Sequence, residues 1–218
     1  LSLIEEGNPQ MIRMAYLSVV ASHTVNGVAA LHTNLLKRHL FNRFHELYPN
    51  KIQNKTNGIT PRRWLKQCNP NYADLISEKI GDGWITDLDQ LKKINDYADD
   101  KAFRDRFAEI KLENKKQLAD YIRENNGVEV DPNSMFDIQI KRIHEYKRQL
   151  MAALHVITLY NRIKENPDRD FTPRTVIFAG KAAPGYTMAK LHIKLINSIG
   201  EVVNNDPQVS DKLKCVFL

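Results

Sequence analysis

The chain has 218 residues, of which 42% are hydrophobic and 27% are charged, a balance that is ordinary for a soluble globular protein. That length suffices for one large domain or for parts of two. The net charge of +6 fits an anionic ligand, but the sequence lacks the basic stripe with interleaved aromatics that marks nucleic-acid binding.

Cysteine usage and hydropathy argue against several further classes. The two cysteines, Cys68 and Cys215, lie far apart and in no metal-ligand pattern, so neither a disulfide framework nor a zinc site is expected. The sequence shows no signal peptide and no apolar run near the length of a membrane span. We therefore expect a cytoplasmic protein that does not enter a membrane.

The first fifty residues predict helices separated by turns. A largely apolar stretch predicts a buried helix over residues 3–21, and Asn26-Gly27 predicts a turn after it. The apolar spacing of residues 28–36 predicts a second helix, and residues 41–48 predict a short third one.

Residues 51–64 are the first stretch with a candidate function. The Asn-Gly pair at Asn57 favours a turn with positive φ, and Thr60-Pro61 marks a helix start with Thr60 as its N-cap. Trp64 then falls in the first helical turn. Two interpretations stay open: a capped helix with Trp64 in the core, or an exposed Asn57 that hydrogen-bonds a polyol while Trp64 supports a planar ring.

Residues 70–125 are predicted to be helical throughout, in three amphipathic segments, and residues 127–134 to form a loop. The third segment has a charge-rich outer face. No functional site is expected on that face.

The densest cluster of charge is KRIHEYKR at residues 141–148, which combines four cations with a histidine and a tyrosine. Residues 136–140 before it alternate apolar and polar, which predicts a half-buried strand, and helical spacing follows to about residue 165. In an open α/β sheet, ligands bind outside the carboxyl ends of the strands, and the first amides of a helix attract anions. The sequence therefore predicts a site for one or two phosphate groups at this junction.

A second interpretation of residues 141–148 is a solvated surface or a loose nucleic-acid contact, because most runs of lysine and arginine are of that kind. Two features favour the anion site. The cations flank a strand–helix junction instead of lying along one exposed helix face, and no second basic run extends them into a track.

The last third of the chain predicts strands that alternate with helices. Residues 174–179 and 214–218 read as strands with a helix over residues 188–203 between them. With the earlier strand, this order is the first half of a doubly wound parallel sheet, so the expected fold class is α/β. Residues 180–186 carry two glycines and a lysine, which indicate either a weak phosphate cradle or tight loop packing. Because a bare terminal strand would leave an unpaired edge, we expect a fragment of a larger protein.

Four longer motifs stand in the chain: SHTVNGVAALH at 22–32, QNKTNGITPRRWL at 53–65, KRIHEYKRQL at 141–150 and GKAAPGYTMAK at 180–190. In this order and spacing they resemble an internal segment of the α-1,4-glucan phosphorylases, the family of glycogen, starch and maltodextrin phosphorylases. The similarity covers essentially the whole chain. Together the four motifs are specific, although any one alone would not be.

The resemblance implies a glycosyltransferase of the GT-B type, whose two Rossmann-like domains face each other across a cleft. Residues 1–62 would be the end of the first domain, and residues 63–218 the opening of the second, which binds pyridoxal phosphate. The implied reaction is phosphorolysis: inorganic phosphate removes the terminal glucose of an α-1,4-glucan as glucose 1-phosphate, with retained configuration. The cofactor's phosphate would exchange a proton with the substrate phosphate. The full-length protein would be a homodimer without a nucleic-acid partner.

The resemblance also implies roles for single residues at the phosphate groups. Arg142 and Lys147 match positions that bind the substrate phosphate, and Lys141 matches a contact to the cofactor phosphate. Trp64 matches a residue that lines the cofactor. His144 lies within the same motif, and we expect a structural role for it.

Three further residues match the sugar site of the family. Asn57 matches a hydrogen-bond partner of the glucose, Val28 lines the same pocket, and Tyr186 matches an aromatic at the entrance of the active-site channel. One departure is an absence: neither the family's Gly-Thr-Gly-Asn-x-Lys segment, which holds the cofactor lysine, nor its glycine-rich loop occurs here. We therefore expect an active full-length enzyme and a fragment that neither binds the cofactor covalently nor turns over glucan.

Two other hypotheses remain. A nucleotide-sugar glycosyltransferase of the same architecture would use the cations of residues 141–148 on a diphosphate, and would need an acidic residue for the ribose at a later strand end. A non-enzymatic module would bind phosphate or nucleic acid through the same residues. Affinity that falls steeply with salt would indicate the module, because several phosphate contacts release several counterions.

Overall fold

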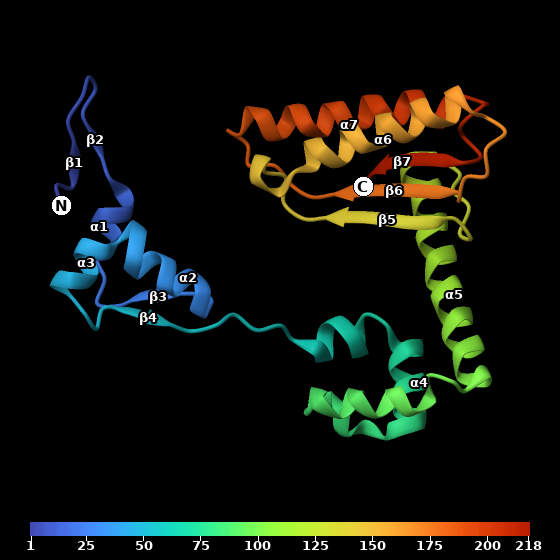
Figure 1. Cartoon of the computed structure of the whole chain (residues 1–218), viewed down its shortest axis with the longest axis horizontal. Helices are drawn as coiled ribbons and strands as arrows, with labels where there is room; N and C mark the ends of the chain where they lie inside the picture. Colours follow the sequence, from blue (N-terminus) through green and yellow to red (C-terminus); the bar gives the residue numbers. More distant parts are fainter. The chain divides into compact units, whose positions relative to one another are not determined.

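The computed structural model describes all 218 residues, which form two compact units, Leu1–Cys68 and Asn69–Leu218 (Figure 1). Both units combine helices with small sheets, so the predicted α/β class is confirmed at this level. The boundary expected between residues 62 and 63 concerns the domains of a longer protein and stays a prediction. None of the helices is both long enough and apolar enough to cross a bilayer.

The first unit contains nine short elements. In chain order they are β1 (Ile4–Glu5), β2 (Met11–Ile12), α1 (Met14–Ala21), β3 (Val25–Gly27), α2 (Ala30–Leu35), the π-helical turn η1 (Leu36–Leu40), α3 (Asn42–Leu47), β4 (Ile52–Asn54) and the π-helical turn η2 (Arg62–Gln67). Its core joins Val19 of α1 to Phe41, Phe44 and Ile52. Tyr16 adds an edge-to-face contact with Phe44 at 5.0 Å between ring centroids.

The single buried helix predicted over residues 3–21 is wrong in its first half. Residues 4–12 form an antiparallel hairpin, β1 with β2, and the helix α1 begins only at Met14. The sequence Gly7-Asn8-Pro9 explains the break, because proline cannot donate the backbone hydrogen bond that a helix needs and Asn-Pro favours a turn. Within α1 only Val19 is buried, so the helix lies on the surface of its unit.

The turn predicted at Asn26-Gly27 is also wrong, because both residues belong to β3, which pairs in parallel with β4. A Cβ at Gly27 would overlap the side chain of Thr33, so this glycine allows α2 to pack directly on the strand. The buried Thr33 hydroxyl lies 2.9 Å from both the Ala29 carbonyl oxygen and Asn54 Oδ1. Gly27 of the Asn-Gly pair therefore permits a close helix–strand contact, and the pair does not form a turn.

The helix start predicted at Thr60-Pro61 is confirmed in position but not in its cap. The carbonyl oxygen of Thr60 accepts hydrogen bonds from the N–H groups of Arg63 and Trp64, both at 3.1 Å. The Thr60 hydroxyl makes no hydrogen bond. The helix that follows is the π-helical turn η2.

The second unit begins with the helices that the sequence predicts and ends with three strands. Its elements are α4 (Pro70–Ile80), the 3-10 helices η3 (Asp82–Ile85) and η4 (Leu88–Tyr97), α5 (Lys101–Asn126), β5 (Met135–Ile140), the 3-10 turn η5 (Glu145–Lys147), α6 (Gln149–Glu165), β6 (Arg174–Ala179), α7 (Thr187–Asn205) and β7 (Leu213–Phe217).

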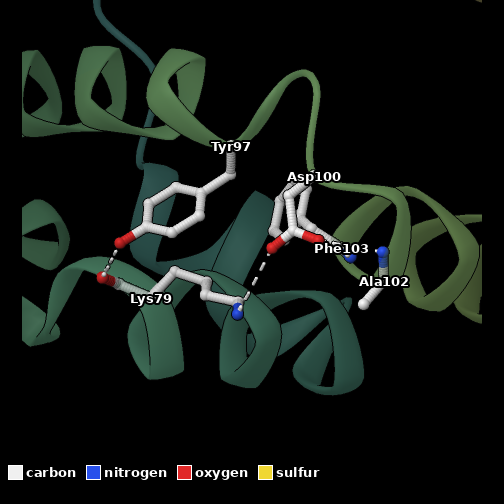
Figure 2. A network of polar contacts seen from close by, with 5 residues as sticks. All are labelled: Lys79, Tyr97, Asp100, Ala102 and Phe103. Atoms are coloured by element: carbon white, nitrogen blue, oxygen red, sulfur yellow. Dashed lines mark hydrogen bonds and ion pairs between the residues drawn. The ribbon is translucent and has the colours of Figure 1, made fainter.

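A polar network fixes the start of α5 against α4 (Figure 2). The carboxylate of Asp100 caps α5 by accepting from the N–H groups of Ala102 at 2.9 Å and Phe103 at 3.3 Å. Lys79 Nζ lies 4.0 Å from the same carboxylate, and Tyr97 donates to the Lys79 carbonyl oxygen at 3.2 Å. One N-cap residue thus ties two helices together while it satisfies the free amides of its own helix.

The three strands of the second unit form one parallel sheet in the order β5-β6-β7. The pairing of β5 with β6 runs from Met135 opposite Arg174 to Ile140 opposite Ala179. Both strands therefore end at the same level, and the loops that follow them leave the sheet side by side.

Helices α6 and α7 cover one face of this sheet, and the end of α5 packs on part of the other (Figure 1). On one face, α6 and α7 pack against Val176 and Phe178 of β6. On the other, Ile122 near the end of α5 packs against Ile177 and Val216. Successive strand residues point to opposite faces, so the run of apolar residues in β6 is buried from both sides, as the sequence predicts.

Side-chain amides occupy the outer edge of β7. Asn204 of α7 donates to the Cys215 carbonyl oxygen at 2.8 Å and accepts from the Cys215 N–H at 2.9 Å. Asn126 donates to the Phe217 carbonyl oxygen at 3.0 Å. These backbone groups have no strand on that side, and the two amides satisfy them instead.

Asp206 joins the ends of α6 and α7. Its Oδ2 accepts from Lys164 Nζ and from the Tyr160 hydroxyl, each at 2.8 Å, and its Oδ1 accepts from the Gln208 N–H at 2.9 Å. These hydrogen bonds, with that of Lys164 the largest, lower the pKa of Asp206 to about 2. They stabilise the carboxylate form, and hence the folded chain at neutral pH.

We predict a pH-dependent effect of Asp206→Asn on stability. Because the pKa is lower in the folded than in the unfolded chain, the stabilisation is present above the unfolded value of 3.8 and is lost as the pH falls toward 2. The difference in free energy of unfolding between wild type and variant should therefore shrink over that range. Denaturant unfolding at several pH values measures it.

The matched control for this prediction is Asp89→Asn, because the Asp89–Lys92 pair is 83% and 78% exposed. Exposed pairs contribute little to stability, so this variant should unfold like wild type throughout. A constant difference between wild type and Asp206→Asn from neutral pH to pH 2 would contradict the prediction.

Candidate functional site

The basic segment 141–148 lies where the sequence predicts it, between the end of β5 and the start of α6. Residues 141–144 leave the strand, and η5 makes one tight turn. Arg148 then has a φ of 63°, in the left-handed region that only glycine adopts without cost. The surrounding contacts must therefore hold this backbone in place.

The loop 180–186, which follows β6, runs beside this segment. The pairing of the strands continues past their ends: the Lys141 N–H donates to the Ala179 carbonyl oxygen at 3.0 Å, and the Ile143 N–H donates to that of Lys181 at 3.1 Å. Gly180 has a φ of 152°, and a Cβ there would overlap the Lys141 carbonyl oxygen. Tight packing of this loop is thus confirmed, and the glycine allows it.

Tyr186 links the far end of that loop to η5. Its hydroxyl donates to Glu145 Oε2 at 2.6 Å and accepts from the Glu145 N–H at 3.2 Å. The hydrogen bond to the carboxylate raises the pKa of Tyr186. The ring of His144 lies between the two tyrosines, with centroids 5.1 Å from Tyr186 and 4.5 Å from Tyr146. His144 Nδ1 also accepts from the Tyr146 N–H at 3.3 Å, which fits the structural role expected for this histidine.

The cations of the segment are left without acidic partners. Lys141 and Arg142 are exposed and Lys147 is half-buried, and none of them forms an ion pair. The only carboxylate among residues 141–148 is that of Glu145, which the Tyr186 hydroxyl holds. With Arg148, which is also exposed and forms no ion pair, two ammonium and two guanidinium groups remain available to an anion. Such charge-assisted hydrogen bonds are the strong ones.

Two glutamines brace this segment, although neither stands out in the sequence. Gln149, at the first position of α6, is fully buried and bonds the backbone of Arg142 and His144. Gln139 of β5 donates to the Lys147 carbonyl oxygen at 3.1 Å. In the sequence Gln149 is only a polar residue at helical spacing from apolar ones, and a glutamine at a helix start can equally well face solvent.

The first unit brings two of the predicted sugar-site residues together. Val28 follows β3 and Asn57 follows β4, at the carboxyl ends of two parallel strands. The Asn57 N–H donates to the Val28 carbonyl oxygen at 2.9 Å. Both side chains are exposed, so they are open to a ligand.

Trp64 also belongs to the first unit, in η2, and its side chain is 65% exposed. The interpretation of Trp64 as a core residue is therefore wrong. An exposed indole in the first helical turn keeps the ring-support interpretation open.

We predict that Gly180→Ala destabilises the second unit by about 2 kcal/mol or more, because it adds backbone strain and an overlap with the Lys141 carbonyl oxygen. Chemical denaturation of the chain measures the loss. Gly185→Ala in the same loop is the control, since its Cβ would meet nothing within 4 Å, and it should change stability by at most about 0.5 kcal/mol. Equal stability of the two variants would show that the loops are not in close contact.

Comparison with known proteins shows the family of the chain. Residues 1–218 match the sequence model of the carbohydrate phosphorylase family. The chain is 57% identical to the muscle form of glycogen phosphorylase from Bos taurus and 56% identical to that from Homo sapiens. It is 56% identical to the liver form from Ovis aries.

Each of these alignments covers all of this chain and 26% of the relative, so the chain spans about a quarter of the length of the curated relatives it matches. The match includes both units, and with them every residue that the sequence singles out. The chain belongs to the carbohydrate phosphorylase family.

Proposed function

We propose that this chain is a segment of an α-1,4-glucan phosphorylase, which uses inorganic phosphate to release glucose 1-phosphate from a glycogen-like glucan. The observation that carries the proposal is the group of unpaired cations at the carboxyl end of β5, within a member of the carbohydrate phosphorylase family. The relatives named above are glycogen phosphorylases, which supports glycogen as the glucan.

The electrostatics of the segment suit this reaction. Phosphorolysis needs an inorganic phosphate, which is itself an anion, held beside a sugar and beside a second phosphate group. Two such groups repel each other strongly at short range unless cations neutralise them. In our proposal Arg142 and Lys147 bind the substrate phosphate, where they stabilise charge as the glycosidic bond breaks.

Pyridoxal phosphate is the cofactor we propose for the full-length protein. The donor set fits its phosphate ester, because Lys141 is an exposed ammonium group without a carboxylate partner, directly after the strand end. Lys141 would hold that phosphate, and the exposed indole of Trp64 would line the cofactor ring. When bound, the cofactor supplies a phosphate that exchanges a proton with the substrate phosphate.

Three residues are proposed to contact the glucan. The exposed amide of Asn57 would hydrogen-bond the terminal glucose, and the neighbouring Val28 would give that pocket an apolar wall. Tyr186 would present its ring at the channel entrance, while its hydroxyl stays bonded to Glu145. Sugar sites commonly combine an apolar surface with a few fixed polar groups.

The wider assembly follows from the same proposal. The full-length protein would have the GT-B architecture, with residues 1–62 closing its first Rossmann-like domain and residues 63–218 opening its second. We propose a cytoplasmic homodimer. The parallel sheet in Asn69–Leu218, with α6 and α7 on one face and the end of α5 on the other, supports a Rossmann-like second domain.

We predict that Arg142→Ala lowers phosphorolysis by the full-length protein by ~10²-fold or more, the size typical of a lost charge-stabilising donor. The assay is release of glucose 1-phosphate from maltodextrin and inorganic phosphate, with and without added pyridoxal phosphate. Wild type should be active only with the cofactor.

The control for this experiment is Arg106→Ala, which removes an exposed arginine of α5 that pairs with Glu109, and it should retain full activity. If Arg142→Ala also kept near-full activity, the basic segment would not be the phosphate site. Absence of phosphorolysis in the cofactor-loaded wild type would refute the proposed function itself.

A further inference from the structure

The side chain of Gln149 packs against the backbone of the basic segment 141–148 and is fully buried. Its Oε1 accepts from the His144 N–H at 3.3 Å, and its Nε2 donates to the Arg142 carbonyl oxygen at 3.2 Å. These two backbone groups flank Ile143, whose own side chain is buried. The amide thus holds the chain on both sides of one buried anchor.

An amide is the group that this position requires. It carries a donor and an acceptor on one carbon, which matches a backbone carbonyl and a backbone N–H that face the same point. A carboxylate can only accept, and an apolar side chain can do neither. Because the site is dry, a backbone group that loses its partner there cannot turn to water.

The other side chains that bond the backbone of the segment, Gln139, His144 and Tyr186, do so through one atom each. The Lys147 carbonyl oxygen accepts from Gln139, whose own Oε1 is buried without a partner. Arg148 follows with its left-handed backbone, which must be held by neighbours. Of the side chains that touch residues 141–148, Gln149 alone has both of its polar ends on their backbone.

We infer that Gln149 is a positioning residue for phosphate binding: it sets the backbone from which Arg142 extends, and so the place of the guanidinium. Gln149 itself lies too deep to touch a ligand. This inference rests on the proposed function, since it takes Arg142 to bind phosphate. It adds a residue that acts only through another one.

The experiment uses two variants of the full-length, cofactor-loaded protein. Gln149→Met keeps the length of the side chain and removes both hydrogen bonds, whereas Gln149→Glu in its ionised form keeps the acceptor and sets an oxygen against the Arg142 carbonyl. Inorganic phosphate is titrated by calorimetry, and KM is measured separately for phosphate and for maltodextrin. A misplaced charged group should weaken phosphate binding and raise its KM by about tenfold or more, since displacements near 1 Å have large effects. The KM for maltodextrin should stay within about twofold.

The matched control is Asn204, whose amide also bonds one backbone N–H and one carbonyl oxygen, both of Cys215. Asn204→Leu and Asn204→Asp make the same chemical changes at the edge of β7, away from residues 141–148. They should lower the midpoint of thermal unfolding but leave phosphate affinity unchanged. A purely structural Gln149 would behave in the same way.

Arg142→Ala, measured in parallel, separates the two proposals. If it does not weaken phosphate binding, the proposed phosphate site is wrong. If it does, and folded Gln149→Met, or Gln149→Glu in its ionised form, binds phosphate like wild type, only the inference about Gln149 is overturned. A melting curve for each variant establishes that it is folded, and Gln149→Glu serves if Gln149→Met does not fold.

Discussion

The parallel register of β5 with β6 is the constraint on which the candidate phosphate site depends. Ile140 lies opposite Ala179, so both strands end together, and two further backbone hydrogen bonds extend the pairing into the loops. A slip of one residue would turn the alternating side chains of β5 to the opposite faces and would separate Lys141 from Gly180. Segments that are forty residues apart in the chain therefore meet because a sheet aligns them.

Whether the cations beside these loops stay unpaired depends on the partners of the nearby carboxylates. Glu145 sits among four cations, yet its carboxylate accepts from the Tyr186 hydroxyl. Lys164 provides the contrast, because Asp206 pairs with it directly and that pair only joins two helices. Asp206 also accepts from the Tyr160 hydroxyl, so the difference between the two carboxylates is the ion pair. Glu145 forms none, and its neighbouring cations stay free for an external anion. Unpaired cations repel each other, so this arrangement favours anion binding at the expense of the stability of the folded chain.

The strand–helix alternation after Ser134 could be predicted because local pattern and tertiary burial agree there. The strand at residues 174–179 has its predicted bounds, since an apolar run in a parallel sheet leaves few alternatives. The first unit departs more from the prediction. The pair Asn26-Gly27 has strong local turn character, but a helix packs so closely on β3 that only glycine fits, and nothing local encodes that contact. Likewise, the largely apolar composition of residues 3–21 suggested a continuous helix where Pro9 breaks the chain.

Some residues of the candidate site could be predicted from the sequence and others could not. The cations of residues 141–148 and the loop at Gly180 stand out in the sequence because four cations cluster within eight residues and two glycines with a lysine follow a predicted strand. Gln149 and the link between Tyr186 and Glu145 do not, because they depend on three-dimensional neighbours. Trp64 lay between two interpretations that the sequence could not separate, and its exposure rejects one of them.

The amides on the outer edge of β7 have a consequence for how the sheet can grow. Asn204 and Asn126 already bond the backbone at Cys215 and Phe217, so an incoming strand would have to displace both side chains. No side chain blocks the backbone of β5 in this way, and Ile138 and Ile140 leave its surface apolar. An added strand would therefore pair more readily beside β5, next to the segment that carries the cations of residues 141–148.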